Sequence, residues 1–401
     1  MNIFKEIPPT AGFPLHLKDI FSALFRLNRK EALEEKLKSY LDLPYARVTY
    51  SGTAAFYFIL ESLKELSDKK TVIIPAFICP LVPLAIKKAG LKIKICDTKI
   101  NSFDYDHGQL ETLCRDDPDI LAVVAAHLGG IPVDLGRINK IAQENNFFTI
   151  EDCAQSLGAE YKNRKIGTYG DFAFFSLCRG KGLTIYEGGV AVTTNEEYAV
   201  LLDNTITRLE NKNSASEALK VFELIGYWIF YRPLLFWFVF RLPQLYWKRK
   251  KDLVRATGDY FDTDLPMHRV SAFRKAVGEV TFGRLEDEIA KQRNEAAAYL
   301  CKFKNSPRIK IILEQIGSKA TYPFITLIFD DSEKRLQVLK RLEKTGVGAS
   351  IIYLKAITDY EYLKHIIPNT PCPNAQAIAA CHLTLSTSTF LDKKLIQSIT
   401  I

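Results

Sequence analysis

A lysine between two glycines is the residue of this sequence whose setting points most directly to chemistry. Lys181 lies between Gly180 and Gly182, shortly after the apolar run 172–177, which ends beside Ser176. Glycines let the backbone approach a ligand closely, and a desolvated lysine loses its proton readily enough to attack a carbonyl carbon. Most loop lysines are solvated surface charges, so Lys181 alone gives only a weak signal.

An acid at the end of a second apolar run strengthens the signal given by Lys181. Asp152 follows the predicted strand 147–150, and the carboxyl ends of strands are where α/β proteins build their sites. A buried carboxylate there needs a cationic partner, and a protonated pyridine nitrogen would serve because the ion pair keeps such a ring an electron sink. The alternative is that Asp152 caps a helix or lies in a loop, which is the commoner role of such an acid.

A third segment could hold a phosphate. Residues 50–55 include Ser51, Gly52, Thr53 and Ala54 and open the predicted helix 55–66. Free amides, the helix dipole and two hydroxyl groups together make an anion seat. Ser51 or Thr53 would equally serve as an ordinary helix cap, and the two roles are compatible.

The elements that must position these residues follow from the pattern of apolar runs. Short apolar runs alternate with amphipathic stretches from about residue 47 to 192, which indicates a parallel α/β sheet with helical crossovers. The predicted strands are 71–74, 92–96, 120–126, 147–150, 172–177 and 189–193, and the clearest predicted helices are 81–89 and 135–145. The loops at the carboxyl ends of the strands should therefore hold the site.

A second unit follows a basic cluster at residues 248–251. This second unit is predicted to contain one long helix over 271–303, strands over 309–313 and 322–329, and a helix over 332–345. At 401 residues the chain is long enough for two domains. We expect a large α/β domain over residues 1–255 and a small α+β domain over residues 256–401.

The segment 219–247, an insert in the large domain, is unusually aromatic. Arg232–Pro233 and Arg241–Pro243 interrupt it. No uninterrupted apolar run of about 20 residues, the length needed to cross a membrane, therefore remains. With the basic residues that follow, region 219–251 could meet the headgroups of an acidic membrane surface. A helical hairpin buried between subunits is an equally weighted alternative.

Composition sets the broad class. The net charge of +8 is modest, and no zinc-finger spacing or RNA-binding signature is visible, so we expect no metal site and no nucleic-acid partner. Eight scattered cysteines, none in CxxC spacing, and a start without a secretory signal indicate reduced thiols and a cytoplasmic location. Peripheral contact with the inner face of the membrane is the one addition that the insert suggests.

These segments resemble the DegT/DnrJ/StrS family of nucleotide-sugar aminotransferases in their order and spacing. The resemblance extends over nearly the whole chain, through the motifs at 127–134, 150–159, 165–171, 187–189, 269–278 and 372–385. It implies a fold-type-I transferase that uses pyridoxal 5'-phosphate. On this resemblance Lys181 and Asp152 are catalytic, with Lys181 carrying the cofactor and moving protons and Asp152 pairing with the pyridine nitrogen.

The same resemblance implies the rest of the cofactor site. Gln155 would lie against the ring or its phenolic oxygen, and Gly52, Thr53 and Ser176, beside Ala54, would hold the phosphate through amides and hydroxyl groups. Three departures from the family pattern stand out. Cys79 occupies the place of an aromatic residue that stacks on the cofactor, Arg179–Gly180 replaces the Pro-Thr before the lysine, and Met267 replaces an asparagine offered to the neighbouring subunit.

The implied activity is amino transfer from an amino acid such as glutamate to a nucleotide-linked keto-sugar, in cell-surface polysaccharide or related biosynthesis, by a homodimer. A sugar dehydratase of the same family is an alternative, although those relatives usually carry histidine where this chain has Lys181. A second alternative is a non-catalytic, membrane-associated or regulatory protein that keeps the fold. The insert, Cys79 and Met267 motivate that second alternative.

Overall fold

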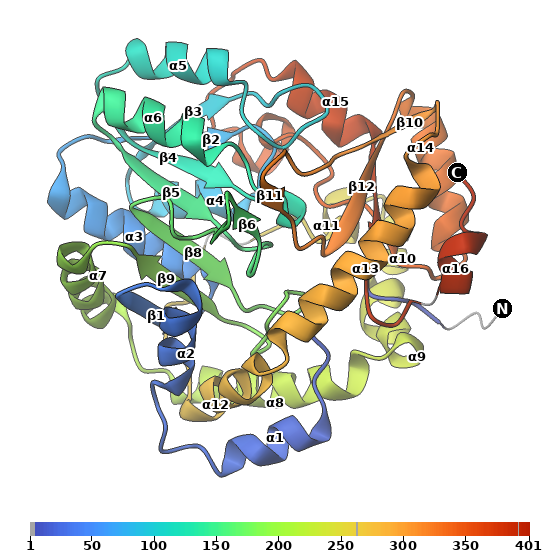
Figure 1. The fold of residues 1–401 in the computed structure, drawn as a ribbon, viewed down its shortest axis with the longest axis horizontal. Coiled ribbons are helices and arrows are strands. Elements are labelled where there is room, and N and C mark those ends of the chain that lie inside the picture. The colour runs from blue at the N-terminus through green and yellow to red at the C-terminus, as the bar shows by residue number, and fades with distance from the viewer. Residues whose placement is uncertain (1–4, 262–263, 392) are drawn as a thin grey trace.

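A seven-stranded sheet lies at the centre of the large part of the molecule (Figure 1). The computed structural model describes residues 5–261, 264–391 and 393–401. In spatial order the strands are β1 (Tyr45–Thr49), β9 (Gly189–Thr193), β8 (Phe172–Ser176), β5 (Phe148–Asp152), β4 (Ile120–Ala126), β2 (Thr71–Pro75) and β3 (Lys92–Cys96). The five strands from β8 to β3 run parallel, while β9 is antiparallel to both of its neighbours. The mostly parallel sheet predicted from the sequence is therefore confirmed.

Helices cover both faces of this sheet, which is why its central strands are apolar throughout. Every residue of β4 is buried. One face is packed by α3 (Gly52–Leu66), α4 (Leu81–Lys88) and α7 (Glu196–Leu209). The other is packed by α2 (Ala32–Leu41), α5 (His107–Arg115), α6 (Leu135–Asn145), α8 (Ser214–Phe230) and α12 (Ala272–Phe282).

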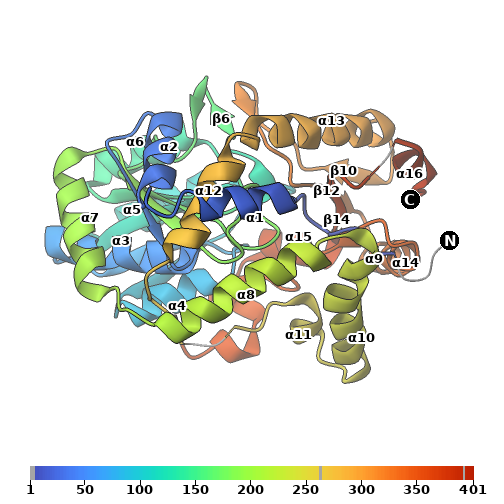
Figure 2. The ribbon, with the colours of Figure 1, turned by 90° about the horizontal axis from the view of Figure 1, so that it is seen from below.

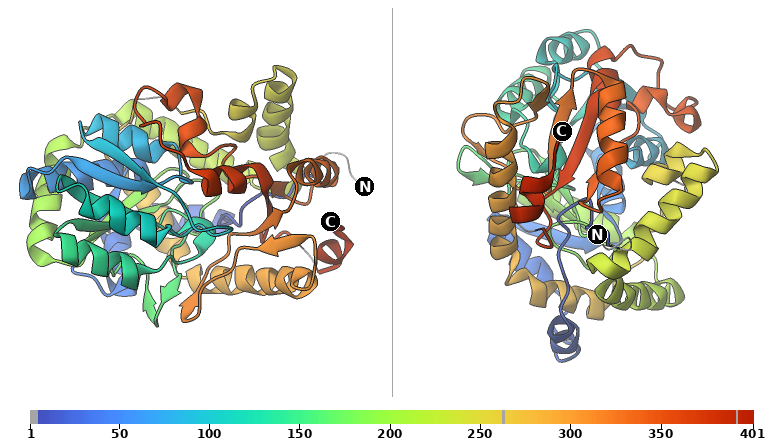
Figure 3. Two further views of the ribbon diagram at one scale, coloured as in Figure 1. Left: turned by 90° about the horizontal axis from the view of Figure 1, so that it is seen from above. Right: turned by 90° about the vertical axis from the view of Figure 1, so that its right-hand side faces the viewer.

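A second, smaller unit is built on an antiparallel sheet of four strands (Figure 3). Its order is β10 (Ile309–Ile311), β12 (Phe324–Phe329), β14 (His382–Ser386) and β13 (Ala349–Ser350), and α13 (Leu285–Phe303), α14 (Ser332–Glu343), α15 (Pro373–Cys381) and α16 (Lys393–Ser398) accompany it. The expected small α+β unit is thus present. A three-stranded ribbon of β6 (Glu160–Tyr161), β7 (Arg164–Lys165) and β11 (Ser318–Lys319) joins the two units.

The amino-terminal segment crosses between the units. Ile7 donates its N–H to the carbonyl of Gly346 at 2.9 Å, and Ser386 donates its hydroxyl to the carbonyl of Pro8 at 2.6 Å. After this crossing, α1 (Leu17–Leu24) packs on α12 of the large part. The division at residues 255 and 256 stays a prediction.

The long helix predicted over residues 271–303 is wrong. Two helices replace it, α12 and α13, and they run in different directions (Figure 2). Gly283 ends α12, and the next residue, Arg284, turns back to form an ion pair with Asp19 at 2.5 Å. The apolar periodicity continues through this turn because α12 packs on the large sheet and α13 on the small one.

The aromatic insert forms a bent helical arm (Figure 2). After α8 come α9 (Pro233–Phe236), a π-helical turn η2 (Trp237–Arg241), α10 (Leu242–Arg249) and α11 (Leu253–Thr257). Pro233 and Pro243 lie in the first turns of α9 and α10, where proline costs no hydrogen bond. Within the described residues, no helix combines the length and apolar character needed to span a membrane.

Candidate active site

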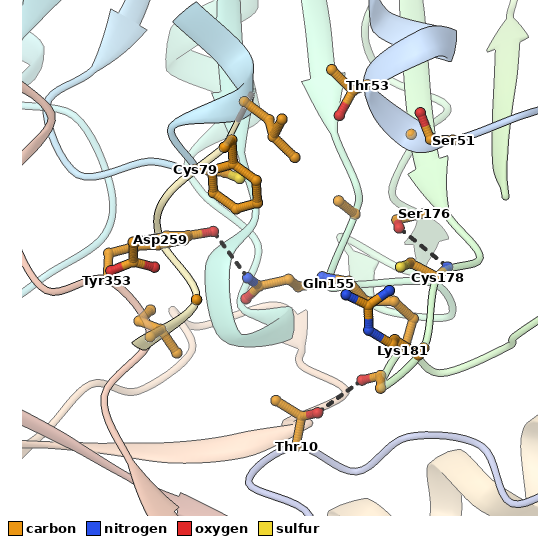
Figure 4. Close-up of a pocket in the computed structure, with 18 of the residues that line it drawn as sticks. Thr10, Ser51, Thr53, Cys79, Gln155, Ser176, Cys178, Lys181, Asp259 and Tyr353 are labelled. Carbon is orange, nitrogen blue, oxygen red and sulfur yellow. Dashed lines mark hydrogen bonds between the residues drawn. The ribbon is translucent and has the colours of Figure 1, made fainter. Parts of the chain in front are cut away.

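A cavity of about 600 Å³ lies between the two sheets, at the carboxyl ends of the parallel strands. His127 follows β4, Asp152 ends β5 and Ser176 ends β8, and all three line this cavity. The segment after β13 contributes Tyr353 from the small unit. Figure 4 shows Ser51, Thr53 and Ser176 at one end, Gln155 near the centre, and Cys79, Asp259 and Tyr353 across from Lys181.

The amino terminus of α3 points its free amides into one end of the cavity. Ser51 caps the helix by accepting the N–H of Ala54 at 3.1 Å. The amides of Gly52 and Thr53 have no acceptor within the helix because they belong to its first turn. A Cβ on Gly52 would come within 3.3 Å of the carbonyl oxygen of Phe175, so glycine lets the helix end approach β8. This end of the cavity can hold a phosphate.

Asp152 is a buried acid whose side chain faces the same cavity. It is 5% exposed and accepts the N–H of Ala154 at 3.0 Å. Burial raises its pKa, while the Ala154 amide and the charges of Lys181 and His127 act in the opposite direction. A cationic ring nitrogen placed beside this carboxylate would relieve the cost of burying its charge.

His127 and Glu151 form the framework behind Asp152. The N–H of Val133 donates to Nδ1 of His127 at 3.2 Å, so Nε2 carries the proton and donates to Glu151 at 3.2 Å. Glu151 also accepts the amides of Gly167, Tyr169 and Gly170. His127, Glu151 and Cys153 lie close enough to hold a metal ion, but backbone donors already occupy the carboxylate and Nδ1. The cluster therefore orients the strand ends.

The loop that carries Lys181 is shaped by a glycine and by the amino-terminal segment. Gly180 has a φ of +78°, a conformation that side chains disfavour, and its carbonyl accepts the hydroxyl of Thr10 at 2.9 Å. Phe13 donates its N–H to the carbonyl of Lys181 at 3.0 Å. The lysine backbone is thus held from both sides while its half-buried side chain lines the cavity (Figure 4).

Gln155 occupies the middle of the cavity and is fixed at both ends of its amide. Its Oε1 accepts the N–H of Gly129 at 2.8 Å, and its Nε2 donates to the hydroxyl of Tyr353 at 3.3 Å. These bonds assign the two ends of the side-chain amide. Gln155 therefore presents a fixed flat surface to the cavity.

The structure brings together six of the seven predicted site residues around one cavity. They are Gly52, Thr53, Asp152, Gln155, Ser176 and Lys181. Ala54 does not line the cavity, because its methyl group is buried in the core and its amide is used by Ser51. The catalytic and cofactor-binding roles themselves stay predictions.

Sequence reasoning missed Asp259, which faces the cavity from the segment after α11. Its Oδ2 accepts the N–H of Leu354 at 2.7 Å and the hydroxyl of Tyr360 at 2.8 Å. Burial raises its pKa. The sequence around Asp259 gave no signal because the partners that hold it come from the distant small unit.

The departures from the family pattern can also be placed. Cys79 lines the cavity, and burial raises the pKa of its thiol to about 12. Phe77, two residues before Cys79, is fully buried and stacks on Phe103, so this neighbouring aromatic ring does not line the cavity. Met267 packs against the core, and Arg179 reaches the cavity.

A sequence profile matches the chain over residues 23–226 and 249–400. The chain belongs to the DegT/DnrJ/EryC1/StrS aminotransferase family. The gap in this match, residues 227–248, coincides with the aromatic arm. The resemblance seen in the motifs around Asp152 and Lys181 is thereby confirmed, and the arm is the part of the chain between the two matched ranges.

Several curated relatives are named for reactions of nucleotide sugars. The chain is 30% identical to GDP-perosamine synthase of Escherichia coli O157:H7 over 169 residues, 42% of this chain and 46% of that protein. It is 24% identical to the UDP-4-amino-4,6-dideoxy-N-acetyl-beta-L-altrosamine transaminase of Campylobacter jejuni serotype O:2 over 357 residues, 88% of this chain and 82% of that protein. The chain spans about half the length of the first curated relatives that it matches.

Solved structures confirm the fold. PseC of Helicobacter pylori superposes with a TM-score of 0.78 at 19% identity, covering 98% of this chain and 97% of that one. The PLP-form of the Streptococcus pneumoniae protein Spr1654 gives a TM-score of 0.77 at 19% identity, covering 98% and 96%. The fold-type-I architecture expected from the sequence is therefore confirmed.

Proposed function

We propose that this protein is a pyridoxal-phosphate-dependent aminotransferase that moves an amino group from an amino acid such as glutamate to a nucleotide-linked keto-sugar. The observation that carries the proposal is the convergence of Lys181, Asp152 and the amino terminus of α3 on one cavity. Family membership and the named activities of the relatives support it. Lys181 favours amino transfer over sugar dehydration.

The residues present fit this cofactor at two separate points. The free amides of Gly52 and Thr53, with the hydroxyl groups of Thr53 and Ser176, match a phosphate. Asp152 is buried and has no cationic hydrogen-bond partner among the described residues, as a site for a protonated ring nitrogen requires. When bound, the cofactor supplies an electron sink for the carbon that loses or gains a proton.

The protein's own groups then have distinct roles. Asp152 keeps the ring nitrogen protonated, and the framework of His127 and Glu151 holds the strand end from which Asp152 projects. Lys181 holds the cofactor, and its Nζ delivers and removes the proton on the reacting carbon. Gln155 and Tyr353 fix the floor between the two sheets. Closing the cavity with residues of both units limits access of water to the reacting atoms.

We further propose that the protein acts as a homodimer. The apolar face of α1 and the turn after it supports an interface, because Phe21, Leu24 and Phe25 are 55%, 48% and 89% exposed. Light scattering of the purified protein should give twice the chain mass, and Leu24→Ser with Phe25→Ser should weaken the dimer. A monomeric wild type at micromolar concentration would contradict this proposal.

For location we propose the cytoplasm, with peripheral contact at the inner face of the membrane through residues 219–251. Support comes from the arm's exposed aromatic and basic side chains. In fractionated cells, part of the protein should sediment with membranes and be released by high salt. Complete recovery in the low-salt supernatant would contradict peripheral contact.

The experiment for the activity needs no knowledge of the acceptor. Purified protein loaded with cofactor is mixed with glutamate, and 2-oxoglutarate is counted in a single turnover. We expect close to one equivalent per cofactor-bearing site and none from Lys181→Ala, which should still bind the cofactor non-covalently. A folded, loaded wild type that forms no 2-oxo acid from glutamate or from the other common amino acids would support the non-catalytic alternative.

A further inference from the structure

The arm has a composition unlike the rest of the chain. From residue 224 to residue 251 the sequence holds six lysines and arginines and no acidic residue. The three tryptophans of the protein, Trp228, Trp237 and Trp247, all lie within it. Most of this segment, residues 227–248, lies between the two ranges that the family profile matches. A positively charged, aromatic segment therefore lies where the chain departs from the family profile.

Large apolar side chains of this segment face solvent on one side. Leu234, Phe238, Leu242 and Leu245 are 53%, 48%, 49% and 43% exposed, and their spacing of three or four residues places them on one helical face. Leu235, Val239 and Tyr246 extend that face. We call these seven residues the insert face. Isolated exposed leucines are ordinary, but a contiguous apolar surface of this kind marks an interaction site.

The opposite side of the arm is firmly attached to the body of the protein. Tyr227 donates its hydroxyl to the carbonyl of Phe13 at 2.9 Å, and Tyr231 donates to that of Thr10 at 3.2 Å. Arg241 and Lys248 form ion pairs with Glu343 at 3.4 Å and 2.6 Å. The exposure of the insert face therefore belongs to a fixed surface.

Three cations at the end of the arm are directed to solvent, whereas Arg232 donates to the carbonyl of Leu15 at 2.8 Å. Arg249, Lys250 and Lys251 are exposed, and no carboxylate of the described residues forms an ion pair with any of them. They follow the insert face directly along the chain. The surface therefore combines half-exposed leucine and aromatic side chains with a cluster of unpaired positive charges at one end.

We propose that the insert face docks on the surface of an acidic lipid leaflet, with α9, η2 and α10 lying in the headgroup plane. Apolar and aromatic side chains enter the boundary between headgroups and acyl chains, and Arg249, Lys250 and Lys251 pair with lipid phosphates. Residues 224–251, a stretch of 28 residues without an acidic side chain, complement the negative charge of the lipid phosphates. A second copy of the chain would offer the same positive surface, which gives the cations no partner.

Docking there would bring the reaction cavity to the membrane. Phe240 and Gln244 lie on the same short helical stretch as the insert face, yet they line the cavity. The cavity wall would then lie about one helix diameter, roughly 10 Å, from the leaflet. The acceptor would be taken up, and the product released, at the membrane surface. The docking itself does not depend on the proposed amino transfer, so the two can fail separately.

Tryptophan fluorescence tests the docking directly because every tryptophan lies in the arm. The full-length protein is mixed with vesicles of phosphatidylcholine and phosphatidylglycerol in a 3:1 ratio, and with vesicles of phosphatidylcholine alone. We expect a blue shift and co-sedimentation with the acidic vesicles, both weakened by salt. Brominated lipid should quench the emission.

One triple variant and three single variants separate the apolar and charged contributions. Phe238→Gln with Leu242→Gln and Leu245→Gln should lower the partition coefficient at least tenfold. Arg249→Gln, Lys250→Gln and Lys251→Gln should each lower binding to the acidic vesicles about fivefold. The matched control exchanges Ile100, Val200 and Ile316, exposed apolar residues outside the arm, for glutamine and should bind as wild type. Circular dichroism melts confirm that each variant is folded.

Three results would overturn the proposal. In the first, wild-type protein stays in the supernatant with unchanged emission. In the second, the variant with Phe238→Gln, Leu242→Gln and Leu245→Gln binds the acidic vesicles as tightly as wild type. In the third, that variant is monomeric while a dimeric wild type ignores vesicles, which would assign the insert face to a second copy of the chain.

Discussion

Gln155, just beyond β5, donates its Nε2–H to the hydroxyl of Tyr353, which follows β13 in the other sheet. This 3.3 Å contact joins the two units across the floor of the cavity. The other end of the Gln155 amide is held by Gly129 at 2.8 Å. The placement of Gln155 against any ligand in the cavity therefore depends on both units.

Tyr353→Phe removes this contact and leaves the aromatic packing of the ring on Phe77. Because a neutral hydrogen bond contributes about 0.5–1.5 kcal/mol, we expect kcat/KM for glutamate to fall about 3–10-fold with little change in Tm. The matched control is Tyr322→Phe, whose hydroxyl accepts the N–H of Glu314 outside the cavity. Equal losses in the two variants would remove the special role of Tyr353.

Asp152→Asn keeps the shape and the Ala154 hydrogen bond but removes the charge. An amide cannot keep a ring nitrogen protonated, so we expect the rate of amino transfer to fall at least 100-fold, roughly 3 kcal/mol in barrier. Asp171→Asn is the control, since Asp171 is a half-buried acid just before β8 that also accepts a backbone amide, from Thr149 at 2.8 Å. Unchanged turnover in Asp152→Asn with cofactor bound would contradict the assigned role.

Glu6 should make the protein less stable as the pH rises. Burial raises its pKa to about 7, although Arg241 lowers it in part. Between about pH 4.5 and 7 the folded state binds more protons than the unfolded one, so the free energy of unfolding falls over that window. Glu6→Gln cannot lose a proton and should remove up to about 3 kcal/mol of this decline.

Denaturant unfolding of wild type and Glu6→Gln at pH 5 and pH 8 checks this. The difference in stability between the two proteins should shift in favour of the variant at pH 8. Other titrating groups cancel in that comparison because both proteins share them. A difference that stays constant from pH 5 to pH 8 would mean that Glu6 ionises normally in the folded protein.

Much of the large sheet could be predicted because its strands are buried on both faces. The ranges expected for β3, β4 and β9 coincide with the observed strands. β4 and β9 are buried apolar runs, whereas β3, at the edge of the sheet, alternates lysines with apolar residues. The strand-end residues Asp152 and Ser176 then fall at one edge of a parallel sheet by geometry alone. That is why most of the expected site converged.

The parts that could not be predicted depend on contacts between distant segments. Asp259 is defined as a cavity residue by Leu354 and Tyr360, which no local pattern links to it. The break at Gly283 was hidden because two helices on different sheets share one continuous periodicity. Ala54 was assigned to the site although the cap by Ser51 takes up its amide. For Asp259 and Gly283 the tertiary partners decide the outcome, whereas the cap by Ser51 on Ala54 is a local contact.

The central claim is that Lys181 holds the cofactor, and covalent trapping tests it most directly. The purified protein is loaded with pyridoxal phosphate, reduced with borohydride and digested, and the peptide containing Lys181 is analysed by mass spectrometry. We predict a phosphopyridoxyl group on the side chain of Lys181 and no such modification in Lys181→Ala treated identically. An unmodified Lys181 in folded, loaded protein, or a modification confined to another lysine, would contradict the account.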